Sequence, residues 1–247
     1  MASWNNGKVV KQKQWNSTLH TLYVASEIEP FQAGQFVKIG LEIDGKIEGR
    51  PYSLVNPPES ELLAFYYINV PNGVLTSHLV QLKTNDTILI APRAHGFLIL
   101  DEIPVSKHLW MMATGTGVGP FLSILETDKP WQRYERVILV YAVRTLAELS
   151  YQDEIQQLLA KHPKQFIYIP FVSREVSDTT MTGRIPQAII DGGLEERAGI
   201  AISAENSQMM LCGNPQMVKD TTDTLIERGL IKNRRTAPGQ ITVENYW

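Results

Sequence analysis

The sequence predicts a two-domain fold, in which an antiparallel β-barrel precedes an α/β domain with a parallel sheet. Turn residues divide roughly the first hundred residues into short strands. From about Lys107 onward, buried strands alternate with amphipathic helices. A chain of 247 residues is long enough for two modest domains. We expect these domains at 1–100 and 101–247, joined through the acidic, proline-containing segment 101–107.

The first half contains several short apolar segments that we expect to be strands. They are 21–28, 35–43, 63–70 and 87–92, with turns at Asp44-Gly45 and Asn72-Gly73. One segment, 75–83, is a candidate helix. Short strands at this spacing favour a closed antiparallel barrel, and a sandwich is the alternative.

The second half repeats a different unit, a continuous apolar run followed by a helical pattern. The expected strands are 108–113, 136–143, 165–172 and 208–212, and the expected helices are 150–162 and 214–230. Uninterrupted apolar strands are typical of a parallel sheet that is covered on both faces.

Composition excludes several classes of protein. The net charge is −3, so the chain offers no broad field for nucleic acid or an acidic membrane, and any basic site must be local. Cys212 is the only cysteine, which excludes an intrachain disulfide and a self-contained Cys₄ iron–sulfur cluster. The histidines lack metal-ligand spacing, so we expect no metal site. Without an apolar signal region or a run of transmembrane length, a cytoplasmic monomer is expected.

A glycine-rich segment, ATGTGVGPFL at 113–122, follows the first strand of the second half. Gly115, Gly117 and Gly119 let the backbone approach a ligand closely, and Pro120 suits the first position of a helix. A loop of this kind favours phosphate binding at the helix start. The alternative is a tight strand-to-helix turn, which also requires glycine.

Arginines follow the next strands of the second half. Arg144 and Arg174 each end a strand, and Arg184 follows a short loop later. The carboxyl ends of parallel strands share one crevice, where guanidinium groups can hold phosphate oxygens. A 2′-phosphate on an adenine nucleotide fits this set and favours NADP over NAD. The alternative is that each arginine caps a helix or pairs with a nearby acid such as Glu175.

In the first half, GRPYSLVNPP at 49–58 places an arginine, a tyrosine and a serine close together. If the segment is extended, Arg50 and Tyr52 share one face and Ser53 lies on the other. Residue type alone favours an ordinary barrel strand. Further along, Thr76 and Ser77 stand at a possible helix start, where a second phosphate could bind.

Four motifs in this order resemble the ferredoxin–NADP reductase family, in its bacterial flavodoxin/ferredoxin type, over nearly the whole chain. Residues 50–53 (RPYS) match the R-x-Y-S flavin motif, and 115–120 (GTGVGP) match the GTGxxP nucleotide loop. Residues 212–215 (CGNP) match the C-G-x-P segment, and 243–246 (VENY) match the V-E-x-aromatic ending. The length and the final Tyr-Trp are similar to the enterobacterial type.

The resemblance implies an FAD-binding barrel followed by an NADP-binding domain. By it Arg50 neutralises the FAD pyrophosphate and Tyr52 packs against the flavin. The residue between Arg50 and Tyr52 is Pro51, which has no backbone N–H. If FAD contacts that N–H in the family, the contact is lost here. The residues implied for FAD are Arg50, Pro51, Tyr52, Ser53, Tyr66, Tyr67, Ile68, Val74, Leu75, Thr76, Thr116, Tyr246 and Trp247. Those implied for NADP are Gly115, Gly117, Arg144, Ser173, Arg174 and Arg184.

The implied activity is electron transfer between NADPH and a one-electron carrier, ferredoxin or flavodoxin, with a hydride passing to flavin N5. The implied catalytic residues are Ser53 beside N5, Cys212 lining the nicotinamide site and Glu244 as a proton relay. These carriers are acidic in the family, so a local basic face is expected. Its candidates are Lys232, Arg234 and Arg235, and a solvated charge run is the alternative.

Two other functions fit parts of the pattern. One is a flavin-dependent NAD(P)H reductase that serves an oxygenase or reduces free flavin. The other is a non-catalytic subunit that holds FAD without a productive NADP site. The chain lacks the cysteines and the length for the iron–sulfur domain that many such reductases carry, and the three arginines favour a dedicated NADP enzyme. We expect Tyr246 beside the isoalloxazine and Trp247 on the adenine, as a clamp that gates the active site.

Overall fold

The computed structural model describes residues 3–245 and divides into two compact units. The first contains the residues up to Ile99 together with Gly119–Thr127, and the second contains Leu100–Val118 and the residues from Asp128 onward. Each unit has its own six-stranded sheet. The chain therefore enters the second unit at Leu100, returns to the first for one helix, and then re-enters the second.

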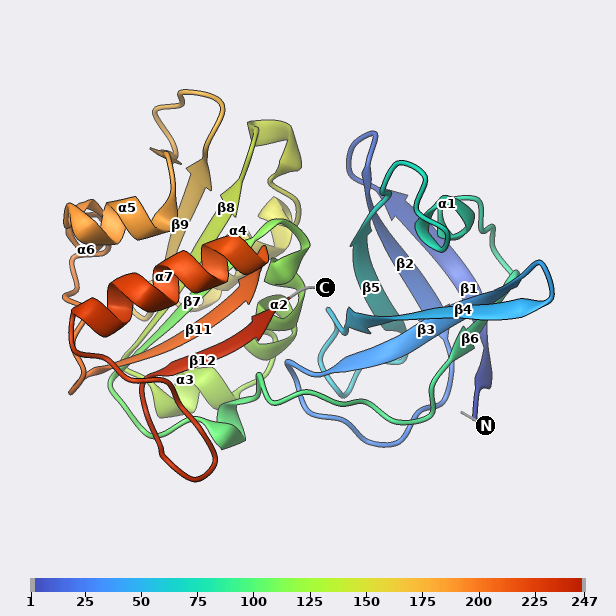
Figure 1. The fold of residues 1–247 in the computed structure, drawn as a ribbon, viewed down its shortest axis with the longest axis horizontal. Helices are drawn as coiled ribbons and strands as arrows, with labels where there is room; N and C mark the ends of the chain where they lie inside the picture. Colours follow the sequence, from blue (N-terminus) through green and yellow to red (C-terminus); the bar gives the residue numbers. More distant parts are fainter. Residues whose placement is uncertain (1–2, 246–247) are drawn as a thin grey trace. The chain divides into compact units, whose positions relative to one another are not determined.

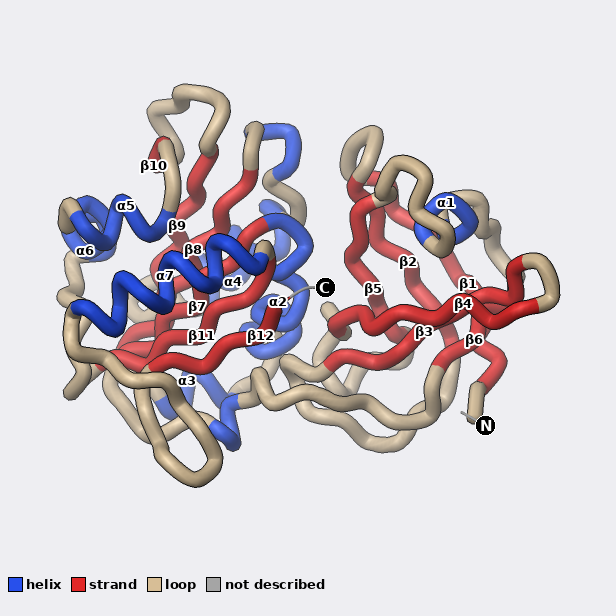
Figure 2. The backbone as a smooth tube through the Cα atoms, viewed as in Figure 1, coloured by secondary structure: helices blue, strands red, loops and turns tan. Residues whose placement is uncertain are grey.

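The first unit is an antiparallel barrel, as the sequence predicts. Its strand order is β4-β3-β6-β1-β2-β5. The strands are β1 (Asn5–Gln14), β2 (Leu19–Ala25), β3 (Phe36–Ile43), β4 (Lys46–Ser53), β5 (Leu63–Ile68) and β6 (Thr87–Ile90). An antiparallel bridge between Leu54 and Phe65 closes the sheet between its two edges. Figure 2 shows this unit as mostly strand, with the short helix α1 (Thr76–Leu79) above it.

The β3–β4 hairpin forms at the predicted Asp44-Gly45 turn. Both residues have positive φ, 51° and 73°, which is the requirement of a tight hairpin turn that matches strand twist. The first strand, β1, is not among the strands that we expected. It is rich in lysine and glutamine, which have low strand propensity, and only Gly7 and Val9 are buried in it.

The barrel core is built by alternate residues of these strands. On β5, Leu63, Phe65 and Tyr67 face the interior, and Leu75 and Leu79 at α1 pack against the same cluster. Where the sequence predicts a helix over 75–83, the structure has a single helical turn, and Leu75 and Leu79 attach it to the barrel core.

The second unit is a wholly parallel sheet with the order β10-β9-β8-β7-β11-β12. The strands are β7 (His108–Thr114), β8 (Arg136–Val143), β9 (Phe166–Val172), β10 (Met181–Thr182), β11 (Ser207–Gly213) and β12 (Ile241–Asn245). Its helices are α3 (Lys129–Arg133), α4 (Gln152–Lys161), α5 (Ile185–Ile190), α6 (Gly193–Ala198) and α7 (Pro215–Glu227). In Figure 1, α5, α6 and α7 lie in front of the sheet, and α4 lies behind it.

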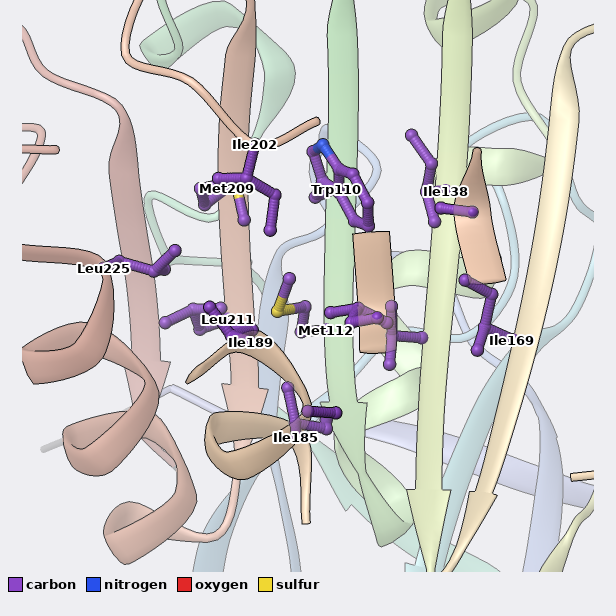
Figure 3. Close-up of a cluster of buried hydrophobic side chains, with 14 of the residues drawn as sticks. Trp110, Met112, Ile138, Ile169, Ile185, Ile189, Ile202, Met209, Leu211 and Leu225 are labelled. Atoms are coloured by element: carbon purple, nitrogen blue, oxygen red, sulfur yellow. The ribbon is translucent and has the colours of Figure 1, made fainter. Parts of the chain in front are cut away.

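One face of this sheet packs against α5 and α7. Figure 3 shows Trp110 and Met112 of β7 beside Met209 and Leu211 of β11, and these side chains belong to one buried cluster. Ile185 and Ile189 of α5 and Leu225 of α7 complete it. The sequence predicts α4 and α7 but not α3, α5 or α6, since helices of five or six residues are too short to show a helical period.

The remaining short elements are three 3₁₀ turns and the helix that returns to the first unit. They are η1 (Leu100–Glu102), η2 (Gly115–Val118), η3 (Leu146–Glu148) and α2 (Gly119–Leu125). Every residue of α2 is buried. The glycine-rich segment is therefore a link between units as well as a turn after β7.

Candidate functional site

The parallel sheet reverses its strand order between β7 and β11. From β7 the chain proceeds to β8, β9 and β10 on one side, and then to β11 and β12 on the other. Ligands of open α/β sheets bind outside the carboxyl ends of the strands at such a switch point. The predicted glycine loop follows β7 here, and Cys212-Gly213 ends β11.

The two loops at the switch point approach each other so closely that they require glycine. A Cβ on Gly117 would lie 2.6 Å from the Cys212 carbonyl oxygen. Gly213 has φ +131°, and a Cβ there would lie 2.7 Å from the Thr114 carbonyl oxygen. Gly115 differs, because its φ is +54° and no atom lies within 4 Å of its ideal Cβ position. Its backbone is open to a ligand.

Asn214 joins the β11 loop to both neighbours. Its backbone N–H donates to Thr114 Oγ1 at 2.9 Å. Its side-chain oxygen accepts from the backbone N–H groups of Gln216 (2.9 Å) and Met217 (3.3 Å), which caps the start of α7. The asparagine was not singled out from the sequence, although Asn-Pro before a helical pattern is the signal that identifies such a cap.

Cys212 and Glu244 lie side by side on β11 and β12, where they are register partners. Cys212 is fully buried. Burial raises the pKa of the Glu244 carboxyl from 4.5 to about 7. Within residues 3–245 that carboxyl has no hydrogen-bond or ion-pair partner, so it is available to a ligand as an acceptor or, when protonated, as a donor.

The three predicted arginines come to the same carboxyl edge of the sheet. Arg144 follows β8, Ser173 and Arg174 follow β9, and Arg184 follows β10 and precedes α5. The Arg174 N–H donates to the Arg144 carbonyl at 2.9 Å, which joins the first two strand ends. Among the described residues, neither Arg174 nor Arg184 forms an ion pair.

Arg144 is paired, and its partner is Glu148 rather than Glu175. The two side chains approach within 2.9 Å. Glu175 instead accepts the Leu146 N–H at 2.6 Å, next to Arg144. Sequence reasoning did not single out Glu148, although an arginine and a glutamate four residues apart are a recognisable signal for such a pair.

In the first unit, Arg50 lies on β4, an edge strand. Its side chain is 60% exposed, and its one charged neighbour among the described residues is Glu48 at 3.6 Å. A surface pair of that length contributes little energy, so the guanidinium is available to an anion. Pro51 is tolerated beside it, because an edge strand has N–H positions that pair with nothing in the sheet.

The aromatic residues near Arg50 form a buried network. Tyr52 meets Tyr67 edge to face at 6.4 Å, and burial raises the pKa of the Tyr52 hydroxyl to about 12. Tyr67 points into the barrel, and its hydroxyl donates to Gln12 Oε1 at 2.5 Å. Because side chains alternate along a strand, Tyr66 lies on the opposite face of β5 from Tyr67, and so does Ile68.

The remaining predicted residues lie around these groups. Ser53 is buried at the end of β4, and Thr116 is buried in η2. Thr76 Oγ1 accepts the Val70 N–H at 3.1 Å, whereas Leu75 is part of the barrel core and Val74 is exposed. The predicted clamp residues Tyr246 and Trp247 lie outside the described residues.

No group of three or more His, Cys, Asp or Glu side chains in residues 3–245 could hold a metal ion. Over the same residues, none of the helices combines the length and apolarity needed to span a bilayer.

Comparison with known proteins identifies relatives over the full chain. Residues 111–223 match the oxidoreductase NAD-binding domain. The flavodoxin/ferredoxin–NADP reductase of Escherichia coli is 45% identical, with both chains covered completely. The ferredoxin–NADP reductase of Pseudomonas aeruginosa is 36% identical over 99% of this chain and 98% of its own.

A solved structure supports the same assignment. The ferredoxin–NADP⁺ reductase of Neisseria gonorrhoeae, described with bound FAD and NADP, superposes with a TM-score of 0.93 and 32% identity, covering 99% of each chain. The sequence identity to full-length relatives, together with this fold, shows that the chain belongs to the family of flavodoxin/ferredoxin–NADP reductases.

Proposed function

We propose that the chain is an FAD-containing reductase that transfers electrons between NADPH and a one-electron carrier, ferredoxin or flavodoxin. The names of the relatives contain both carriers, and the Neisseria gonorrhoeae enzyme is described with both cofactors. One observation carries the proposal. A single edge of the parallel sheet holds the glycine loop at the switch point and three arginines at neighbouring strand ends.

The residues of this edge fit NADP. Strand order places Glu244 and Cys212 on one side of the glycine loop and Arg144, Arg174 and Arg184 on the other. A dinucleotide has two chemically different ends, and this edge of the sheet likewise has an arginine-rich end and an end with a carboxyl and a thiol. We assign the arginines and Ser173 to the 2′-phosphate, and the backbone of Gly115 and Gly117 to the coenzyme between its ends. Cys212 and Glu244 then belong to the nicotinamide end.

The residues of the first unit fit FAD. Arg50 offers an exposed guanidinium with only a distant carboxylate partner, which suits a pyrophosphate. Tyr52 and Tyr66 supply aromatic surface, and Ser53 supplies a hydroxyl that we assign to flavin N5. Tyr67 supports Tyr52 from inside the barrel. The rest of the proposed set is Pro51, Ile68, Val74, Leu75, Thr76, Thr116, Tyr246 and Trp247.

The chain's own contribution to the reaction is binding, orientation and proton handling. FAD supplies the redox chemistry when bound, because it accepts a hydride and releases electrons singly. Glu244 exchanges a proton near neutral pH, which suits a relay at the nicotinamide end. Cys212, being fully buried, fills space beside that carboxyl without adding charge.

The proposal extends to the partner and the location. Lys232 and Arg234 are exposed, and Arg235 pairs with Glu102 at 2.9 Å. We assign this basic segment to docking of an acidic carrier. The protein is proposed to act as a cytoplasmic monomer, which cell fractionation and native mass spectrometry test.

Visible absorbance of the purified protein tests the proposal directly. We expect a yellow protein that NADPH bleaches faster than NADH, and that a ferredoxin or flavodoxin then reoxidises. A colourless protein that takes up no FAD would overturn the main proposal. Bleaching by NADPH with no transfer to either carrier would overturn the assignment of the carriers.

Two arginines at opposite ends of β8 provide a matched pair for the coenzyme assignment. Arg144 follows the carboxyl end of β8, and Arg136 begins the strand at the opposite edge. A lost charge-assisted contact is worth about 1.5–3 kcal/mol, so Arg144→Ala should lower kcat/KM for NADPH about 10- to 100-fold. Activity with NADH should hold, and Arg136→Ala should leave both coenzymes unchanged.

A further inference from the structure

Arg144 is held by one carboxylate through three of its donors. Glu148 accepts from the Arg144 backbone N–H at 3.1 Å and from Nε at 3.0 Å. It also lies 2.9 Å from Nη2. The Glu148 side chain is 18% exposed and that of Arg144 is 49% exposed. The carboxylate is thus the more fixed partner of the pair.

The loop that carries Glu148 is itself held from several sides. The Tyr141 hydroxyl, from the buried strand β8, donates to the Glu148 carbonyl at 3.3 Å. The Leu146 N–H, at the start of η3, donates to Glu175 at 2.6 Å. Tyr151, where the loop ends, has φ +61°, a left-handed conformation that an aromatic residue rarely adopts. A strained residue among so many contacts indicates a loop with one defined shape.

The geometry leaves a defined part of the guanidinium unused. An arginine side chain has five N–H donors in one plane, and Glu148 occupies the edge formed by Nε and Nη2. The Nη1 donors and the outer donor of Nη2 point away from that edge. This second edge can hold two oxygens of a phosphate while the first stays on the carboxylate.

We propose that Glu148 is a positioning residue of the coenzyme site, which presets Arg144 to receive the 2′-phosphate of NADP. This rests on the proposed function. The benefit is entropic, because an arginine that is already ordered loses little rotamer freedom when the ligand binds. The carboxylate also repels the phosphate, but the guanidinium lies between them and both groups are partly in water, so screening weakens the repulsion.

Binding of two nucleotides to the full-length flavoprotein tests the proposal without turnover. The probes are 2′,5′-ADP, which carries the 2′-phosphate, and ADP, which does not, measured by calorimetry. Glu148→Ala should weaken 2′,5′-ADP about three- to tenfold, the size of a partly exposed ionic contact, and leave ADP unchanged. Glu148→Gln keeps one acceptor oxygen, so its loss should be smaller.

Two controls separate positioning from other roles. In an Arg144→Ala background, Glu148→Ala should have no further effect, because the group that it orients is gone. Asp153→Ala removes an exposed carboxylate five residues further along and should change neither nucleotide. Tighter 2′,5′-ADP binding in both Glu148 variants would show competition for Arg144 and overturn positioning. Equal weakening of ADP and 2′,5′-ADP would show a merely structural role and overturn it too.

The wild-type protein distinguishes failure of this inference from failure of the proposed function. If wild type binds ADP as tightly as 2′,5′-ADP, the assignment of the arginines to the 2′-phosphate is wrong. If wild type prefers 2′,5′-ADP but Glu148→Ala leaves that preference intact, the coenzyme site stands and the positioning role of Glu148 is wrong.

Discussion

At the scale of single residues, the site is built from groups whose properties depend on burial. Glu244 is an ordinary carboxylate by sequence, but in β12 it is half-buried beside Cys212, and its pKa rises from 4.5 to about 7. Burial disfavours the charged form, since no described residue compensates for the lost water. Glu148, a glutamate in a different setting, instead forms an ion pair with Arg144.

We predict that Glu244 makes stability depend on pH in a definite direction. The folded protein keeps the Glu244 proton up to about pH 7, whereas the unfolded chain releases it near 4.5. The stabilisation from the bound proton is therefore full below 4.5 and is lost as pH rises through about 7. Glu244→Gln removes this dependence. The unfolding free energy of the variant relative to that of wild type should therefore increase by a few kcal/mol between about pH 5 and pH 8.

Urea denaturation of both proteins at the two pH values measures that difference. Glu196→Gln makes the same substitution at an exposed position of α6 and should leave the pH dependence of wild type unchanged. A Glu244→Gln curve that stays parallel to wild type at both pH values would contradict the prediction.

At the scale of elements, the segments that follow β7 and β11 approach each other so closely that positions 117 and 213 accept no residue larger than glycine. Glycine at 117 and 213 permits the approach of the two loops, and Asn214 then links the β7 loop to the start of α7. Asn214 thus connects the end of β7, the end of β11 and the first turn of α7. The position of α7 is therefore coupled to the loop that follows Cys212 at the end of β11.

We predict that Asn214→Ala destabilises the protein by about 1 kcal/mol, the usual value of a helix N-cap. The cap contacts to Gln216 and Met217 are lost, whereas the backbone contact to Thr114 remains. Asn214→Ser keeps a capping oxygen and should recover most of the loss. Urea midpoints give the comparison, and equal midpoints for wild type and the alanine variant would show that the cap contributes nothing.

At the scale of the whole molecule, the first unit is not continuous in sequence. Its barrel is formed before residue 100, but α2 joins it from the middle of the second unit's sequence. Phe121 and Ile124 of α2 are fully buried, and Ser123 Oγ donates to the Asn56 carbonyl of the barrel unit at 2.7 Å. The helix thus contributes apolar surface to one unit while it is attached to the other.

We predict that a fragment of residues 100–247 exposes this apolar surface. Its α2, which belongs to the first unit, would lack the rest of that unit, so Phe121 and Ile124 should become accessible and the fragment should bind a hydrophobic dye and self-associate. The full chain should do neither. Replacing both residues by serine in the fragment should reduce dye binding. A fragment that is monomeric and binds no dye would contradict this account of α2.

Net charge is also a property of the whole molecule. At −3 the chain would repel an acidic carrier of the kind proposed above, so the proposed docking needs a local basic region. We predict that Arg234→Glu raises KM for the carrier at low salt and leaves KM for NADPH unchanged. Arg197→Glu reverses an exposed arginine on α6 and serves as the control. Equal effects of the two reversals would point to overall charge instead of this segment.

The sequence predicted more of the fold than of the site. The continuous apolar strands β7, β8, β9 and β11 are found where we expected them, because burial on both faces leaves an unmistakable run. The polar strand β1, the two-residue strand β10 and the short last strand β12 are not among the strands that we expected, because none of them has a long apolar run. Of the site, the motifs supplied the arginines and the glycine loop but not Glu148, whose role depends on a loop shape.

What the sequence determined by itself is local. Glycine with positive φ, aspartate–glycine at a hairpin, asparagine–proline before a helix and apolar runs all act through neighbouring residues, so they can be read along the chain. Only the tertiary structure decided which strand ends meet. It placed Cys212 beside Glu244 on neighbouring strands, and it partly buried Glu244, enough to raise the pKa of its carboxyl. Proximity and desolvation arise between segments distant in sequence, and no local pattern records them.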